Sequence, residues 1–170
     1  MPQPSPAFLA KCSPLHARLH ALWDAKRAGR AMPARADFEF EELKPWLGWL
    51  VLYDVLPGAL PDGPDFAYRL FGSLVAHGMG AELTAGRVSQ AAMTVDRSFA
   101  LETLRAVWHS RAPSWRDDLA ICTDGFSYTP ERLFLPLAAD GETVDMILMY
   151  AAHFRDKQGK EIKPPATQLF

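Results

Sequence analysis

The sequence predicts an α+β fold: a five-stranded antiparallel sheet with helices over one face, preceded by an amphipathic N-terminal helix. One observation is a long helical pattern followed by three strand patterns, which are joined by the turn sequences TDGF (123–126) and ADGE (139–142). The other is a pair of earlier strand patterns separated by PGALPDGPD (57–65), a run of turn-forming residues. Because strands joined by short turns pair antiparallel, this order builds one cupped sheet.

The length and composition set the domain plan. With 170 residues, of which 49% are hydrophobic, the chain can bury one sizeable core, and a second full domain is not expected. We expect a disordered N-terminus over residues 1–13, a helical extension over 14–48, the sheet domain over 49–154 and a polar tail over 155–170.

The charge and the cysteines indicate where the protein works. A formal net charge of −2 gives no uniformly basic surface, so we expect no binding to nucleic acid. The N-terminus lacks a signal-peptide pattern, and no apolar run approaches the ~20 residues that cross a bilayer, so we expect no membrane association. Cys12 and Cys122 show no CxxC spacing and are interpreted as reduced thiols. These features predict a soluble, cytoplasmic protein.

Local signals bound the N-terminal helix. Ser13 is a suitable N-cap, Pro14 fits the first helical position and Gly29 supplies a stop. We therefore expect a helix over residues 14–28. Its apolar stripe has i, i+4, i+7, i+8 spacing and consists of Leu15, Leu19, Leu22 and Trp23. The stripe needs a partner, which is either the protein's own sheet or the same helix of a second subunit in a homodimer.

Two histidines, His16 and His20, lie one turn apart on this helix. Their spacing allows metal chelation, but no carboxylate or third histidine joins them locally. We interpret both as solvated residues and predict no metal site.

The second strand covers residues 65–71. Strand alternation puts Phe66, Tyr68 and Leu70 on one face, so we expect a core-facing Tyr68 whose hydroxyl needs a partner. The long helix then begins at Thr94 or Asp96 and ends before Pro113. The last three strands are expected over 114–122, 127–138 and 143–153.

Five short segments occur in a fixed order: LW at 22–23, MPARADFE at 32–39, FAYRLFG at 66–72, LTAGR at 83–87 and ERLFLPL at 131–137. Their order and spacing resemble a bacterial family of PAS-like single-domain proteins, whose patterns read LP.RADFDP, F.YRL.G, LTG-R and ERL.LPL. The resemblance covers roughly residues 15–153. This chain departs from the family pattern by one inserted alanine, Ala85.

The resemblance implies a PAS-like fold whose concave sheet face and covering helices can enclose a small molecule. It implies signalling more than catalysis. PAS modules of other families enclose haem, flavin, carboxylic acids or nothing, and they often dimerise through a helix before the core. The chain carries no recognisable output domain, so we expect its signal to leave through a signalling protein partner or through a change in the dimer.

We place the expected ligand pocket between the long helix and the sheet. Its predicted lining is Tyr68, Leu70, Leu104, Trp108, Phe134 and Met146, with His77 and Arg87 near the mouth. The alternative is that these side chains simply fill the core, which we favour for the aromatic and methionine positions. Arg69 and Arg132, within predicted strands, are interpreted as solvent-facing, with anchoring of an anionic ligand as the second reading.

The sequence leaves the cofactor unidentified. Residues 72–87 contain no cysteine for covalent flavin photochemistry. The side chains chemically able to ligate haem are His77, His109, Met79, Met93, Met146 and Met149, but a lone histidine or methionine more often packs in the core.

The alternative from another functional class is a small cone-shaped α+β isomerase or hydratase, with Tyr68 and Asp145 as acid and base. The chain contains no GxSxG elbow, Walker A loop or HExxH helix. We therefore predict a sensor or docking module rather than an enzyme.

Overall fold

An antiparallel sheet forms the centre of the molecule, with five strands in its main path, as predicted, and a sixth short strand beside them. The computed structural model describes residues 10–79, 82–91, 97–118, 121–123, 126–155 and 160, with side chains except at 77–79, 97–98, 121–123, 126–129 and 153–155. The main strands pair in the order β2–β1–β6–β5–β3, and β4 also pairs with β5. Their bounds are Leu50–Leu60 (β1), Gly63–Phe71 (β2), Ser114–Arg116 (β3), Ile121–Thr123 (β4), Phe126–Leu137 (β5) and Met146–Arg155 (β6).

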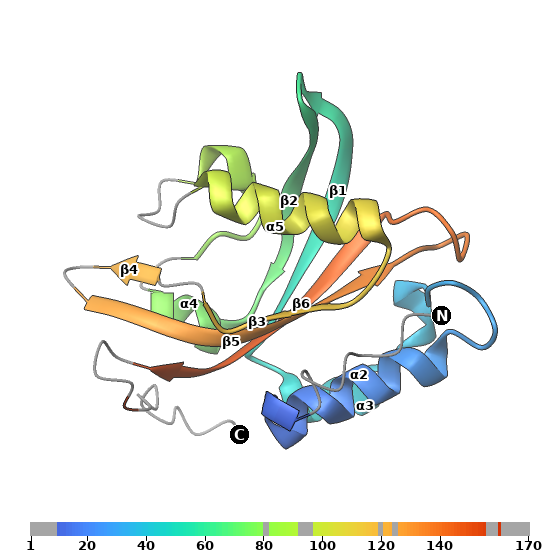
Figure 1. Cartoon of the computed structure of the whole chain (residues 1–170), viewed down its shortest axis with the longest axis horizontal. Helices are drawn as coiled ribbons and strands as arrows, with labels where there is room; N and C mark the ends of the chain where they lie inside the picture. The colour runs from blue at the N-terminus through green and yellow to red at the C-terminus, as the bar shows by residue number, and fades with distance from the viewer. Residues whose placement is uncertain are drawn as a thin grey trace.

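Helices lie against both faces of this sheet. Helix α5 (Arg97–Ser110) crosses one face, as predicted, and α2 (Pro14–Lys26) lies against the other (Figure 1). The other helical segments are α3 (Phe40–Leu43), α4 (Ser73–Met79) and the 3-10 turns η1 (Arg35–Asp37), η2 (Lys44–Trp46) and η3 (Val88–Gln90). The α+β class is confirmed. No helix in the described ranges is both long and apolar enough to span a bilayer.

Local capping sets the ends of α2. The His16 backbone N–H donates to Ser13 Oγ at 3.4 Å, which confirms the predicted N-cap. Beyond the last turn, Ala28 and Gly29 have φ angles of 48° and 88°. These left-handed conformations end the helix close to the predicted stop.

The last three predicted strands are present, but the first of them is split into two strands. The predicted strands over 127–138 and 143–153 correspond to β5 and β6. The predicted strand over 114–122 is divided into β3 and β4, both of which pair with β5. Three predictions fall mostly or wholly outside the described residues: the disordered N-terminus, the polar C-terminal tail, and the start of the long helix at Thr94 or Asp96.

A β-bulge in β2 reverses the predicted direction of Leu70. Two consecutive residues of β1 pair with Leu70 and Tyr68, so Arg69 is an extra residue in β2. Beyond the bulge the alternation shifts: Leu70 is 47% exposed, whereas Phe71 is 6% exposed. The prediction that Leu70 shares the core face with Tyr68 is therefore wrong.

Gly72 ends β2 where the chain passes close to other backbone. A Cβ at this position would overlap the Gly48 carbonyl oxygen and lie 2.7 Å from the Leu50 oxygen. The Gly72 N–H also donates to that Leu50 oxygen at 2.8 Å. Only glycine allows this approach.

The β1–β2 hairpin is longer than predicted and extends past α5 (Figure 1). Both strands continue into the proline- and glycine-rich segment, which leaves only residues 61–62 between them. Arg105 of α5 holds the hairpin by donating to both carboxylate oxygens of Asp62, at 2.7 and 2.9 Å, and to the Pro64 oxygen at 3.1 Å. The helix is thus fastened across the sheet at this end.

Candidate functional site

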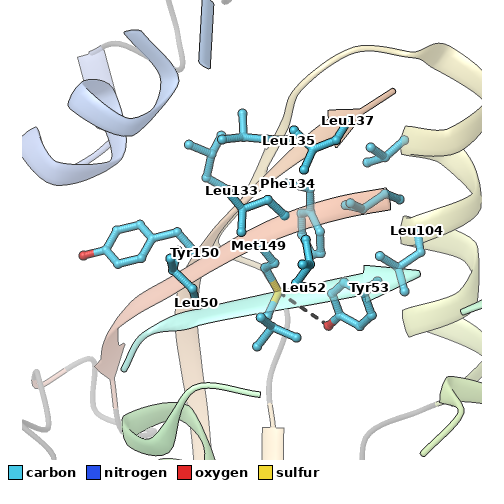
Figure 2. Close-up of a cluster of buried hydrophobic side chains, with 14 of the residues drawn as sticks. Leu50, Leu52, Tyr53, Leu104, Leu133, Phe134, Leu135, Leu137, Met149 and Tyr150 are labelled. Atoms are coloured by element: carbon cyan, nitrogen blue, oxygen red, sulfur yellow. Dashed lines mark hydrogen bonds between the residues drawn. The ribbon is translucent and has the colours of Figure 1, made fainter. Parts of the chain in front are cut away.

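The face of the sheet under α5 collects side chains from four strands. Four residues in register across the sheet share this face: Phe134, Met149, Val51 and Phe71. Leu104 of α5 packs in the same core and is 2% exposed. Figure 2 shows Tyr53 directed toward Leu104, while Tyr150 points away from it. This α5 face is the one on which a ligand pocket was predicted.

Two tyrosines place hydroxyl groups on this face. Tyr53 and Tyr68 are register partners on β1 and β2, with ring centroids 5.2 Å apart. The Tyr53 hydroxyl donates to Met149 Sδ at 3.8 Å, and a thioether is a weak acceptor (Figure 2). The Tyr68 side chain is 7% exposed, and its hydroxyl has no hydrogen-bond partner among the described residues.

Burial keeps both phenols protonated. Desolvation raises the pKa of Tyr53 well above its usual value. Desolvation also raises the pKa of Tyr68 to about 12, against the opposing effect of Arg132. Both groups are therefore hydrogen-bond donors at neutral pH.

Arg132 adds a buried positive charge. It is 8% exposed and lies two residues from Phe134 along β5, hence on the same face. Desolvation lowers the pKa of Arg132 to about 10, although Tyr53, Asp118 and Tyr68 act in the opposite direction. The side chain is still cationic at neutral pH. The prediction that Arg132 faces solvent is wrong, because the alternation that buries Phe134 also buries Arg132.

A second arginine, Arg116, lies beside Arg132. Arg116 of β3 is the register partner of Arg132. Its Nε and Nη2 donate to the two oxygens of Asp118 at 2.9 and 2.8 Å. Its guanidinium also lies 5.0 Å from the centroid of the Phe99 ring in α5. Because Asp118 neutralises Arg116, the pair ties β3 to α5 without adding net charge.

Arg69 behaves as predicted. Its side chain is exposed, and Nη1 donates to the two oxygens of Asp54 at 3.1 and 3.2 Å. It stands outside the α5 face.

Part of the predicted pocket lining meets on the α5 face. Tyr68, Leu104 and Phe134 are buried there, and Trp108 is half-buried against the same core. Met146 is not with them, because alternation along β6 groups it with Tyr150, which packs on His16 of α2.

The other predicted residues lie elsewhere. Leu70 points outward after the bulge. Arg87 is exposed, and its backbone pairs with Ala67 at the outer edge of β2. The His77 side chain lies outside the described residues.

The opposite face of the sheet buries a different side of α2 from the predicted stripe. The buried residues are His16, Leu19, His20 and Trp23, whereas Leu15 and Leu22 are half-buried. Leu19 and Trp23 are enclosed within their own chain, so the prediction that they form a dimer interface is wrong. The prediction that His16 and His20 are solvated is also wrong. The partner of this helix is the chain's own sheet.

Hydrogen bonds explain why polar side chains are tolerated on this α2 face. Trp23 Nε1 donates to the Pro136 oxygen at 2.8 Å, and Trp46 Nε1 donates to the Leu15 oxygen at 3.0 Å. A polar group buried with a partner avoids most of the desolvation cost. The first contact holds α2 against β5, and the second joins η2 to α2.

His16 is the most enclosed polar group on the α2 face. Its Nδ1 lies 2.6 Å from Ser13 Oγ, and its Nε2 lies 3.4 Å from the Glu131 carbonyl oxygen. Glu131 Oε2 is 3.8 Å from Nδ1, and the Tyr150 ring is 4.5 Å away between centroids. A catalytic triad places the nucleophile and the acid at opposite imidazole nitrogens, whereas here both approach Nδ1. The cluster is therefore a structural contact.

The structure also assigns Asp145 a structural role. Its carboxylate accepts a hydrogen bond from the Ala139 N–H at 2.8 Å, and its carbonyl accepts from Val55 N at 2.9 Å. The first bond spans the turn between β5 and β6, and the second joins that turn to β1. No group of three or more metal-ligating side chains occurs in the described part of the chain.

Sequence reasoning missed Tyr53, Arg132 and His16 as features of these faces. The signal for Arg132 was present, since ERLFLPL alternates and Phe134 was already expected inside. The signal for His16 was the i, i+3, i+4, i+7 set that it forms with Leu19, His20 and Trp23.

Comparison with known proteins agrees with this architecture. Residues 12–150, well over half of the chain, match the sequence model of a PAS domain family. No curated protein and no solved structure matches the chain. The matched region runs from just before α2 into β6, so it includes both faces of the sheet. The chain therefore belongs to the PAS domain family, as its sequence motifs predicted.

Proposed function

We propose that this PAS module is a sensor that binds a small molecule between α5 and the sheet, where Tyr68 hydrogen-bonds to the ligand. PAS domains are typically sensory rather than catalytic, which supports a signalling role. The observation that carries the proposal concerns Tyr68: the residue is 7% exposed, and its hydroxyl has no hydrogen-bond partner among the described residues. A ligand atom that accepts its proton would add a hydrogen bond, which contributes about 0.5–1.5 kcal/mol to binding.

The chemistry of the α5 face suits a mainly apolar ligand. Leu104, Phe134 and Phe71 supply apolar contact, and Tyr53 and Tyr68 supply two protonated donors. Binding sites for small molecules combine these features: a mostly hydrophobic lining with a few placed polar groups.

Retention of a ligand tests the proposal directly. The intact protein is purified without added metabolites, and its mass is compared under native and denaturing conditions, together with its visible spectrum. We expect a non-covalent mass excess that is lost on denaturation. The paired Tyr68→Phe and Tyr53→Phe variants then separate the two donors, with the larger loss of bound ligand for Tyr68→Phe. A protein with no mass excess, whose α5-face resonances stay unmoved across a metabolite panel, would contradict small-molecule sensing.

We also propose that the signal passes to a second copy of the chain or to a protein partner. With Leu19 and Trp23 buried, the half-buried Leu15 and Leu22 are the large apolar residues of α2 that remain for such a contact. Light scattering of a Leu15→Glu/Leu22→Glu double variant tests the dimer. We expect a folded monomer from the variant and a dimer from the parent protein. A monomeric parent protein would contradict the dimer.

A further inference from the structure

Residues 82–91 form a strap along the outer edge of β2, beside the residue that carries the proposed ligand donor. The Tyr68 N–H donates to the Gly86 oxygen at 2.9 Å, and the Ala85 N–H donates to the Tyr68 oxygen at 2.7 Å. Ala85 is the alanine inserted in the LTAGR segment, and its φ angle of 67° is one that residues other than glycine rarely adopt. The inserted residue thus supplies one of the two backbone bonds to Tyr68.

A buried carboxylate fastens the other end of the strap. Asp65 of β2 is 0% exposed. Its Oδ2 accepts from Ser89 Oγ at 2.6 Å, and its Oδ1 accepts from the backbone N–H groups of Ser89 and Phe66 at 3.2 and 2.8 Å. Ser89 belongs to η3, which contacts both β2 and α5. The bonds between Asp65 and Ser89 therefore latch the strap where β2 and α5 meet.

The strap is held more weakly than α5. Val88, which is 1% exposed, anchors it in the core. The side of the strap turned to solvent consists of Glu82, Thr84, Ala85, Gly86, Arg87 and Gln90. Helix α5, by contrast, buries Leu104 and Val107, and Arg105 fastens it to the β1–β2 hairpin. A segment with few buried apolar contacts opens at a lower free energy than the core around it.

The α5 face needs an opening, because Tyr68 is only 7% exposed. When the strap lifts, Asp65 exchanges its bonds with Ser89 for bonds to water, and the net cost of such an exchange is modest. Val88 loses its burial at the same time, which drives the strap back onto the sheet. The latch and the anchor together make the opening reversible.

We propose that the strap is the gate of the α5 face: the bonds between Asp65 and Ser89 break, residues 82–91 leave the edge of β2, and a small molecule then reaches Tyr68. This inference rests on the proposed function, because it describes how a ligand enters the same site. Helix α5 stays fastened by Arg105 while the gate opens. Tyr68 should therefore become accessible without unfolding of the rest of the protein.

Acetylation of tyrosine by N-acetylimidazole measures this accessibility. The reagent transfers its acetyl group to the phenol oxygen and releases imidazole, and peptide mass mapping gives the rate at each tyrosine. Tyr150, which is 2% exposed on the α2 face, is the internal reference. Below the urea unfolding transition, we expect the rate at Tyr68 to be nearly independent of urea, because a local opening exposes little surface. The rate at Tyr150 should rise with urea.

A cross-link tests whether the strap itself is the moving part. Ala67 and Arg87 are antiparallel register partners, a placement within reach of a disulfide. The Ala67→Cys/Arg87→Cys protein, oxidised in a Cys12→Ser/Cys122→Ser background, is compared with Ala67→Ser/Arg87→Ser in the same background. We expect the cross-link to slow acetylation of Tyr68 and to give it the urea dependence of global unfolding.

Two substitutions within the strap test the latch without a cross-link. Ser89→Ala should raise the rate at Tyr68 at least about tenfold in the absence of urea, because a hydrogen bond to a charged group is lost. Ser89→Thr, which keeps the hydroxyl, should stay close to the parent protein. Thr84→Ala is the matched control, since Thr84 Oγ1 donates at 2.6 Å to Glu82 within the strap and not to the sheet. It should leave the rate at Tyr68 unchanged.

The outcomes separate the gate from the sensor, because acetylation requires no ligand. A retained ligand together with a Tyr68 rate that ignores both the cross-link and Ser89→Ala would keep the sensor and overturn the gate. A urea dependence at Tyr68 as steep as that at Tyr150 would also overturn the gate. Strap-dependent acetylation in a protein that retains no ligand and responds to no metabolite would support the opening and contradict the sensor.

Discussion

His16 and Trp23 on the α2 face differ from Tyr53 and Tyr68 on the α5 face in how their polar atoms are hydrogen-bonded. Against α2, His16 contacts Ser13 and the Glu131 backbone, and Trp23 donates to the Pro136 oxygen. Under α5, the Tyr53 hydroxyl meets only a thioether, and the Tyr68 hydroxyl meets no described partner. Satisfied buried groups fix one geometry, whereas unsatisfied ones keep capacity for a ligand. The difference agrees with the proposal that α2 is a fixed attachment and that the ligand binds on the α5 face.

We expect the largest loss of stability from a substitution that weakens the packing of α2 on the sheet. Trp23→Ala removes a ring that is 2% exposed together with its hydrogen bond to Pro136. We expect the free energy of unfolding to fall by about 3–5 kcal/mol, measured by urea denaturation. Leu22→Ala, at a half-buried position of the same helix, should cost less. A loss below about 1 kcal/mol for Trp23→Ala would show that α2 is not part of the folded core.

We expect the second-largest loss of stability from a substitution of the buried His16. His16→Ala removes the contacts with Ser13 and Glu131 and the packing on Tyr150. We expect a loss of about 1–3 kcal/mol in the free energy of unfolding, because buried groups lose their partners. His109→Ala, at an exposed position in the last turn of α5, serves as the control and should change stability by less than about 0.5 kcal/mol. Equal effects of the two variants would contradict a special role for the α2 face.

Removal of a polar group from the α5 face should not lower the stability of the protein. Tyr68→Phe removes a hydroxyl without a described partner. We expect stability without ligand to be unchanged or to rise by up to about 1 kcal/mol, because no hydrogen bond is lost and less desolvation is required. Thermal denaturation of ligand-free protein measures this. A clear destabilisation would mean that the hydroxyl is already satisfied, and the contrast between the two faces would then disappear.

The smallest effect concerns pH. Burial is the main cause of the lowered pKa of His20, which Arg27 also lowers and Asp24 opposes. The folded state therefore favours neutral His20, so its contribution is present above the unfolded pKa of about 6.5 and is lost as pH falls below it. The free energy of unfolding should decrease between about pH 7 and 5. His20→Gln should flatten this dependence of stability on pH, and His109→Gln, at an exposed position, should not. Equal slopes in the parent protein and both variants would rule out His20 as the cause.

Local patterns predicted much of the architecture. Ser13, Pro14 and Gly29 bounded the first helix, because caps and stops act through neighbouring backbone. The TDGF and ADGE turns predicted the antiparallel order of the later strands. The candidate site was predicted only in part: Tyr68, Leu104 and Phe134 meet, whereas Leu70 and Met146 do not.

The sequence by itself determined the type, order and approximate ends of the helices and strands, because these depend on period, caps and turns within a few residues. The tertiary structure decided which side of each element is buried. The bulge at Arg69 turned Leu70 outward, and partners 113 to 115 positions away allowed Trp23 and His16 to be buried on α2. A polar side chain is buried where a distant segment supplies its hydrogen bond, and no local pattern encodes that supply.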